Sequence, residues 1–179
     1  MRTKRKAAMF VEQRLARDRT EAHHDARALA IELARGVPST RFDPMTEGVV
    51  LQPGETVYRQ LPIWIRVQEN GRWAEASYAD LIVTEQRLLC RFATGHLASL
   101  WWTGIVGLNV DLAAEHIVLD FGDGQPVSLS GGQVAVVAVA AIALIYGTQA
   151  MLAHPALASL RTCGSAPGFQ QPPDWWLNS

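Results

Sequence analysis

The residue types that most often carry catalysis or bind metals are sparse in this sequence and are not spaced for either task. Glu21, His24 and Asp25 would lie on neighbouring positions of a helix, which is a possible set of metal ligands. An exposed polar helix face explains the same residues. Three further histidines are isolated in the sequence: His96, His116 and His154. Neither HExxH nor GxSxG occurs, nor a cysteine–histidine arrangement, so the sequence predicts no catalytic residue, no metal site and no enzyme.

Two glycine-containing motifs are similar to nucleotide-binding or ion-binding loops. LSGGQ at residues 129–133 matches the signature loop of ABC-type ATPases, whose amide groups meet a γ-phosphate at a helix N-terminus. ATP hydrolysis also requires GxxxxGK[ST], and the chain has no lysine after Lys6. DFGDGQP at residues 120–126 lacks the spaced carboxylates and closing glutamate of a calcium loop. We therefore interpret them as a strand-to-helix turn with Ser130 as N-cap and as a hairpin turn, and expect no cofactor.

Candidate contacts with a partner come from tryptophans and from a basic cluster at the N-terminus. The adjacent Trp101 and Trp102 would point to opposite faces of one strand, one inward and one outward. A second tryptophan pair lies in a Pro-rich tail, where exposed tryptophans favour docking on the protein itself or on another chain. The basic cluster suits an anionic lipid surface, and nucleic acid is a less favoured partner. The predicted partner-binding residues are Arg2, Lys4, Arg5, Lys6, Trp101, Trp102, Trp175 and Trp176.

The composition describes a foldable chain with an uneven distribution of charge. Hydrophobic residues make up 49% of the chain and charged residues 18%, which is typical of a folded domain. A length of 179 residues is enough for one domain with an appendage. Residues 1–35 hold nine basic and five acidic residues, whereas the remainder holds seven basic and twelve acidic ones. Cys90 and Cys163 are far apart and form no CxxC pair. This pattern favours a reducing cytoplasm over a disulfide framework, and we expect no secretion signal.

The N-terminal part of the chain is expected to form one helix over residues 7–35. Apolar residues recur there at spacings of three and four: Val11, Leu15, Ala22, Ala26, Leu29 and Leu33. Gly36 and Pro38 are typical helix stop signals, and residues 36–48 have the composition of a linker. Because the apolar stripe is narrow and rich in alanine, this helix needs another surface in order to be stable.

Between residues 49 and 132 the apolar period changes to two, which is typical of strands. The expected strands cover residues 56–69, 72–78, 79–84, 87–92, 97–102, 105–112, 116–121 and 126–129. Asn70-Gly71 predicts a hairpin turn. Short strands at this spacing favour an antiparallel sheet that curls into a sandwich or barrel, so the fold class is mainly β with α.

Residues 134–153 form an apolar stretch without a charged residue, and its large side chains fall on every side of a helical wheel. Such a helix must be covered on more than one side, as a core element, a membrane span or an interface. At about 1.5 Å per residue it is long enough to cross a bilayer. Its many alanines, the interruption at Gly147 and the uncharged N-terminal flank favour burial within the protein.

Three segments resemble bacterial pleckstrin-homology-like (PH-like) and GRAM-type domains: LQPGE at 51–55, LIVTEQRLLCRF at 81–92 and SLWWTGIVGLNVDL at 99–112. The resemblance covers roughly residues 48–160 and implies a curled antiparallel barrel capped by a C-terminal helix. The expected organisation is an N-terminal helix with a basic arm (1–35), a linker (36–48), the barrel with its helix (49–160) and a Pro/Trp tail (161–179). The final helix departs from the family pattern because it is apolar all round.

This organisation predicts a non-catalytic binding or scaffolding module of the cytoplasm that engages a protein partner or, peripherally, an anionic membrane surface. Two alternatives stay open: a membrane-inserted protein that uses residues 134–153 as its span, and a small-molecule-binding barrel. We further expect the helix at 7–35 to pack on the helix at 134–153, either in the same chain or in a partner copy.

Overall fold

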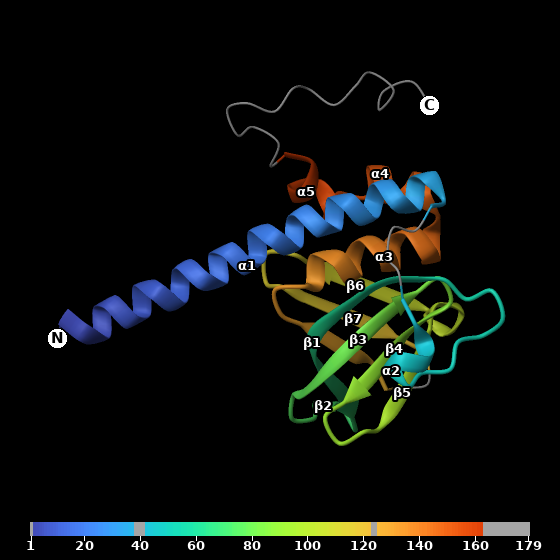
Figure 1. Ribbon diagram of the computed structural model, residues 1–179, viewed down its shortest axis with the longest axis horizontal. Coiled ribbons are helices and arrows are strands. Elements are labelled where there is room, and N and C mark those ends of the chain that lie inside the picture. The colour runs from blue at the N-terminus through green and yellow to red at the C-terminus, as the bar shows by residue number, and fades with distance from the viewer. Residues whose placement is uncertain (1, 38–41, 123–124, 163–179) are drawn as a thin grey trace.

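The computed structural model describes residues 2–37, 42–122 and 125–162, and within these ranges the side chains from Arg17 to Arg161. The chain forms a curled antiparallel sheet covered by helices (Figure 1). The helices are α1 (Arg2–Arg35), α2 (Pro44–Glu47), η1 (Trp102–Gly104), α3 (Val134–Tyr146), α4 (Thr148–Ala153), η2 (Pro155–Leu157) and α5 (Ala158–Thr162). The strands are β1 (Val57–Glu69), β2 (Arg72–Trp73), β3 (Ser77–Thr84), β4 (Arg87–Phe92), β5 (Leu97–Trp101), β6 (Gly107–Asp111), β7 (His116–Asp120) and β8 (Val127–Ser130).

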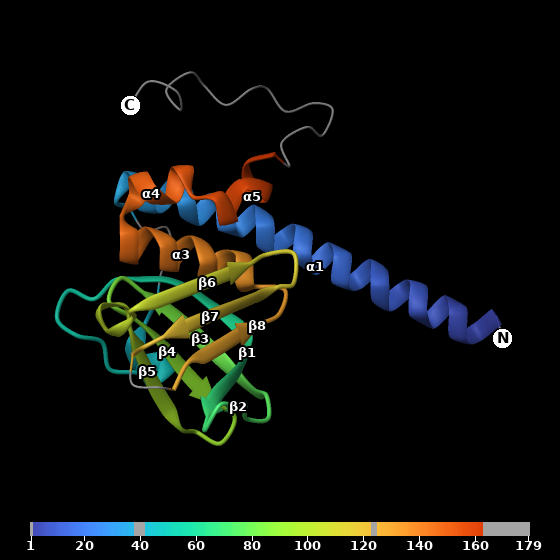
Figure 2. The ribbon, with the colours of Figure 1, turned by 180° about the vertical axis from the view of Figure 1, so that it is seen from behind.

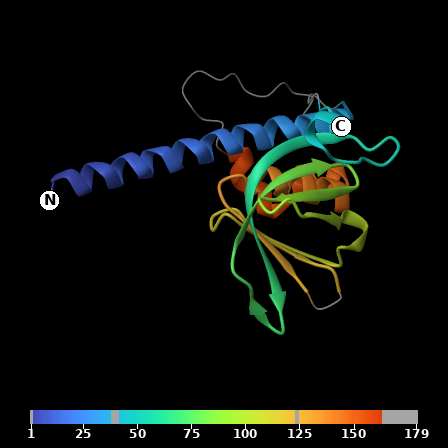
Figure 3. The same cartoon turned by 60° about the horizontal axis from the view of Figure 1, so that its bottom comes forward.

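The sheet has the strand order β5-β4-β3-β1-β8-β7-β6, and every pair in it is antiparallel. The long strand β1 joins the two halves, because it pairs with β3 through Val57–Ile65 and with β8 through Trp64–Val67. The first and last strands of this order, β5 and β6, do not pair with each other, so the barrel is half open (Figure 3). The predicted mixed fold of antiparallel strands with N-terminal and C-terminal helices is confirmed, in the arrangement that a PH-like domain implies.

The core lies between the inner face of this sheet and α3. Leu61, Ile63 and Ile65 alternate along β1 and are each at most 4% exposed. The first ten residues of α3, Val134 to Ala143, are all buried, because the sheet covers one side of the helix and α1 the other (Figure 2). Each large side chain buried in this way contributes about 1.5–3 kcal/mol. The expectation that this helix is covered on more than one side is confirmed.

Helix α1 packs on α3 within the same chain, which confirms the intrachain form of the predicted helix–helix contact. Its stripe of Ala22, Ala26, Leu29 and Leu33 is buried, and the small alanines allow the two helices to approach closely. The helix starts at Arg2 instead of residue 7, so the basic arm is helical too. Its N-terminal part extends beyond the barrel (Figure 1).

Ion pairs between α1 and β1 add to this apolar contact. Arg59 of β1 donates from Nε to Asp25 Oδ1 and from Nη2 to Glu32 Oε1, both at 2.8 Å. The hydrogen bonds to Glu32 are the main cause of the raised pKa of Arg59. Burial lowers this pKa, but the hydrogen bond and the charge of Asp25 raise it further. The guanidinium therefore fixes the angle at which α1 crosses the first strand.

The apolar stretch at residues 134–153 forms two helices, α3 and α4, which meet at Gly147, the interruption that the sequence indicated. This residue has φ 91° and ψ 161°, a conformation that side chains other than hydrogen strongly disfavour, and α4 begins directly after it. Among the helices that the structure describes, none combines the length and the apolar character that crossing a bilayer requires. The predicted N-cap is wrong: Gln133 occupies that position without a capping side-chain bond, and Ser130 ends β8.

The segment predicted as a linker at 36–48 contains the short helix α2, and a further turn, α5, follows residue 154. Asp43 caps α2 by accepting from the Met45 N–H, and Arg91 of β4 binds Glu47 at 2.9 Å. The chain that follows covers part of the outer face of the sheet. A second, smaller core forms there from Val49, Val57, Ile82 and Leu89, with Phe42 and Leu51 packed against it.

Candidate binding surface

The alternation of side chains along β1 places a tryptophan on the outer face of the sheet. Since Leu61, Ile63 and Ile65 point into the core, Trp64 points outward and is 47% exposed. Its partner across the β1–β3 pair is Tyr78, which is 50% exposed. The two rings meet edge to face, with centroids 5.3 Å apart and planes at 71°. Exposed aromatic side chains of this size favour contact with a ligand or partner.

The β1–β2 hairpin adds a third aromatic ring and a cation to the same face. Asn70 and Gly71 both have positive φ, which gives the tight turn that the sequence predicted and pairs Gln68 with Trp73. Trp73 therefore lies on the face of Gln68, Arg66 and Trp64, and is 40% exposed. We name Trp64, Arg66, Trp73 and Tyr78 the Trp64 surface. Arg66 is exposed, and it forms no ion pair with any residue that the structure describes.

Polar side chains of β8 and β7 border the Trp64 surface on its other side. Ser130 lies opposite Trp64 and Ser128 opposite Arg66. His116 of β7 shares a hydrogen bond of 2.8 Å between its Nε2 and Ser128 Oγ. The surface is therefore aromatic and cationic, and the partly exposed Ser130 and His116 border it, while the buried Ser128, and no carboxylate, lies directly opposite Arg66.

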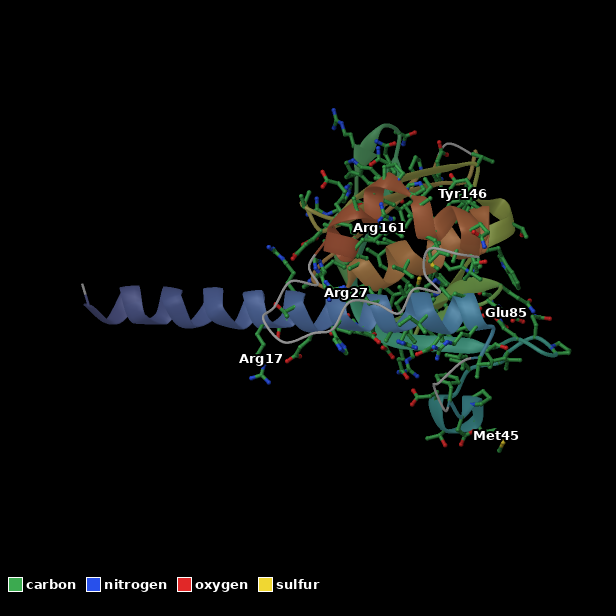
Figure 4. All side chains as sticks on the ribbon, turned by 90° about the horizontal axis from the view of Figure 1, so that it is seen from above. Arg17, Arg27, Met45, Glu85, Tyr146 and Arg161 are labelled. Atoms are coloured by element: carbon green, nitrogen blue, oxygen red, sulfur yellow. The ribbon has the colours of Figure 1, made fainter. Side chains whose placement is uncertain are left out.

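Helix α1 leaves the barrel beside this surface. Arg19 binds the carboxylate of Glu115, in the turn between β6 and β7, and the Glu115 carbonyl accepts from the Gly131 N–H at 3.1 Å. Gly131 follows Ser130, the partner of Trp64. We name residues 2–17 of α1 the projecting segment: it extends from the side of the barrel where β1 and the β1–β2 hairpin lie (Figures 1 and 2). Figure 4 shows Arg17 at the base of this segment, pointing away from the barrel.

The charge of the projecting segment is strongly positive. Residues 2–17 contain six basic residues and one acidic residue, a net charge of +5. Arg17 forms an exposed pair with Glu21 at 2.8 Å, one turn along the helix. The segment and the Trp64 surface together give this side of the molecule cationic and aromatic character.

The two adjacent tryptophans that the sequence singled out have different surroundings, one outward and one inward as predicted. Trp101 is 39% exposed and its ring lies 4.6 Å from the Arg87 guanidinium. Trp102 begins η1 and is 5% exposed, and its Nε1 donates to the Thr84 carbonyl at 2.9 Å. Trp102 is thus part of the core, which leaves Trp101 as the candidate for a contact with a partner.

Arg87, beneath Trp101, belongs to a buried ion pair. Its Nη2 and Nε lie 2.9 Å from the two carboxylate oxygens of Glu55. Burial by itself raises the pKa of Glu55, but hydrogen bonds from Arg87, from the Gln52 N–H and from Thr84, with the Arg87 charge, hold that pKa below its usual value. Every lone pair of this carboxylate is engaged within the protein, so the pair is structural and not a site for a ligand.

The remaining predicted partner-binding residues have side chains outside the described part of the chain, whereas the possible metal ligands lie within it. The backbone of α1 includes Arg2, Lys4, Arg5 and Lys6, whose side chains are outside the described residues, and Trp175 and Trp176 are outside them as well. Within the described ranges, no three His, Cys, Asp or Glu side chains come together as metal ligands. Glu21 binds Arg17, and Asp25 binds Arg59. Burial raises the pKa of Cys90 to about 12, so this thiol is not a nucleophile at neutral pH.

The sequence reasoning missed the Trp64 surface, although a signal for it was present. Trp64 and Arg66 stand at the alternate positions of a strand whose other positions are Leu61, Ile63 and Ile65. That pattern places Trp64 outward wherever the aliphatic residues face a core. The contribution of Trp73 and Tyr78 could not be read in this way, because it depends on the register of two strand pairs.

No family model matches the sequence, and no curated protein matches it. Among solved structures, the chain is similar to the Vps36 N-terminal PH domain, at 15% identity and a TM-score of 0.41, over 58% of this chain and 86% of that chain. It is also similar to the C-terminal domain of an unknown protein from Leishmania infantum, at 14% identity and a TM-score of 0.38, over 52% of this chain and 86% of that chain.

Proposed function

We propose that this protein is a non-catalytic binding module that attaches to an anionic membrane surface through the projecting segment and the Trp64 surface. The observation that carries the proposal is their common position: a helical segment of net charge +5 leaves the barrel beside three exposed aromatic rings and Arg66, which forms no ion pair within the described part of the chain. Basic residues are attracted to anionic lipids, and Trp and Tyr favour the headgroup region of a bilayer. Both chemistries therefore point to the same kind of surface.

The projecting segment and the Trp64 surface together are expected to bind an anionic bilayer more strongly than either of them alone. Each basic residue near an anionic leaflet contributes about 1 kcal/mol, and this contribution falls with ionic strength. A basic helix alone binds such a surface reversibly, and partial insertion of aromatic side chains adds apolar burial. The proposal therefore predicts binding that salt weakens but does not abolish.

Co-sedimentation with vesicles tests the proposal. The protein is mixed with phosphatidylcholine vesicles that either contain or lack phosphatidylserine, over a range of salt concentrations. We expect binding to the anionic vesicles only, and a loss of roughly 30-fold in affinity for the Lys4→Gln/Lys6→Gln variant, since two basic residues contribute about 2 kcal/mol. Arg35→Gln/Arg161→Gln removes the same charge far from the projecting segment and is the matched control. Absence of binding by the unaltered protein, or equal losses in both variants, would refute the proposal.

A protein partner is the second candidate, because Trp, Tyr and Arg are the residues that most often dominate protein interfaces. The composition of the Trp64 surface is the observation that favours it. Trp64→Ala separates the two candidates. Reduced vesicle binding in this variant supports the membrane contact, whereas unchanged vesicle binding assigns the Trp64 surface to a protein partner.

A further inference from the structure

We infer that the edge strand β5 pairs with β5 of a second copy of this chain, in antiparallel orientation. The inference is independent of the proposed membrane contact, since β5 lies at the end of the strand order and Trp64 on its central strand. The two-fold symmetric pair would join two curled sheets edge to edge. The backbone, the side-chain sequence and the charges of the strand each support it.

The outer edge of β5 presents backbone groups that form no hydrogen bond with any residue the structure describes. The Phe92 N–H donates to the His96 carbonyl, and the Trp102 N–H donates to the Gln86 carbonyl. Because hydrogen-bonded positions alternate in an antiparallel pair, residues 98 and 100 also face β4. The N–H and C=O groups of Leu97, Ser99 and Trp101 therefore point away from the sheet. An extended chain is the structure that meets such a row of groups.

The sequence of β5, LASLW, is complementary to itself. An antiparallel pair centred on Ser99 places this residue opposite its own copy, and Leu97 opposite Trp101 of the partner. The backbone groups of Leu97, Ser99 and Trp101 point away from β4, so in this register each of these residues forms hydrogen bonds with the partner strand. On the outer face Leu97 is 44% exposed and Trp101 39%, and an aliphatic–aromatic pair across strands is favourable. On the inner face Ala98 meets Leu100, so no position opposes a polar group with an apolar one.

The charges around β5 leave nothing to oppose this pairing. Natural proteins protect a free edge with lysine, proline or an inward charge, and β5 contains none of these. The two arginines opposite it on β4 are neutralised within the chain: Arg87 by Glu55, and Arg91 by Glu47 and Asp80. The other edge strand, β6, carries the exposed residues Asn109 and Asp111, which is the protection that β5 lacks.

Sedimentation velocity over a series of protein concentrations tests the inference. Because a five-residue strand gives a small interface, we expect a reversible monomer–dimer equilibrium and not a permanent dimer. Ser99→Pro removes the central outward N–H without removing a bond to β4, and is expected to leave only monomer. Ser99→Ala is the matched control: it loses the Arg87 Nη1 bond to Ser99 Oγ, as the proline variant does, but keeps the N–H and should still dimerise.

A second pair of variants keeps the test decisive if the proline variant does not fold. Leu97→Lys places a charge on the outer face of β5 and should lower the dimerisation constant at least tenfold. Val106→Lys, at a position that is 72% exposed outside β5, should have no effect. An unaltered protein that stays monomeric at all concentrations, a dimer unaffected by Leu97→Lys, or one weakened equally by Val106→Lys would each overturn the inference. Vesicle binding by a protein that stays monomeric would leave the proposed function standing.

Discussion

Among single residues, Arg87 and Glu55 stand out because both are charged and buried, and they form an ion pair with each other. The side chains of Arg87 and Glu55 are 8% and 0% exposed, and two hydrogen bonds join the guanidinium to the carboxylate. Thr84 donates to Glu55 from its hydroxyl at 2.7 Å, and the ring of Trp101 shields the guanidinium from water. The pair ties the chain before β1 to the β3–β4 hairpin, so its loss affects more than one element.

Replacing one member of this pair is expected to destabilise the protein strongly. Arg87→Ala leaves the Glu55 carboxylate buried without its counter-ion, which costs about 3–5 kcal/mol in the free energy of unfolding. Urea denaturation followed by circular dichroism measures the change. The double variant Arg87→Met/Glu55→Leu removes both charges and should be more stable than Arg87→Ala. A double variant less stable than the single one would contradict this account.

The same carboxylate predicts a dependence of stability on pH. Because the pKa of folded Glu55 is lower than its ordinary value of 4.5, the group contributes stability above that pH. This contribution is lost as the pH falls below 4.5 and through the folded pKa. The difference in unfolding free energy between the unaltered protein and Glu55→Gln should therefore shrink as the pH is lowered from neutral to below 4.5. A difference that stays constant over this range would show that Glu55 does not titrate in the expected sense.

At the scale of the elements, the break at Gly147 converts one apolar stretch into two helices with different tasks. Helix α3 fills the space between sheet and α1, whereas α4 turns back and buries Met151, which is 2% exposed. Arg27 of α1 donates to the Leu160 carbonyl at 2.7 Å and so ties the returning chain to α1. The turn therefore places two successive helical segments against the same long helix.

Substituting Gly147 tests the importance of this turn. Gly147→Ala is expected to destabilise the protein by about 1–3 kcal/mol, because alanine is strained at this combination of φ and ψ. A Cβ at residue 147 would meet no atom within 4 Å, so the cost comes from the backbone alone. Gly132→Ala has the same free space without the positive φ and serves as the control. Equal thermal midpoints for the two variants would contradict the strain argument.

At the scale of the whole molecule, α1 has two parts with separate roles. The part from about Ala22 onward covers α3, and the projecting segment extends beyond the barrel. Leu29 and Leu33 are buried against the core, so removing them would expose the apolar side of α3 to water. The division predicts that truncations of different length have different consequences.

Two truncations test this division. Deleting residues 1–17 should leave a folded protein with a much weaker affinity for anionic vesicles, because the deletion removes a net charge of +5 and spares the buried stripe of Ala22, Ala26, Leu29 and Leu33. Deleting residues 1–35 should expose α3 and cause aggregation, since its second face then has no cover. Circular dichroism measures folding, static light scattering measures aggregation, and co-sedimentation measures the affinity for vesicles. A protein without residues 1–35 that stays soluble and monodisperse would show that α1 is a passive appendage.

Most of the local structure of this protein follows from patterns within short stretches of its sequence. Alternation of apolar residues located the strands, and β4 runs from Arg87 to Phe92 as predicted. Asn70-Gly71 identified the hairpin, and the spacing of Ala22, Ala26, Leu29 and Leu33 identified the buried stripe of α1. These features depend on neighbours within a few residues, which is why periodicity and turn chemistry report them.

Which surfaces are covered and which are exposed depends on contacts between segments that are distant in the sequence. Periodicity placed one of the adjacent tryptophans outward, but not that Trp101 would lie against Arg87, or that residues 42–51 would cover the outer face near Ile82. It likewise could not bring Trp73 and Tyr78 beside Trp64, since that depends on the registers of two strand pairs. Alternation divides a strand into two faces, whereas the packing of distant segments determines what each face meets.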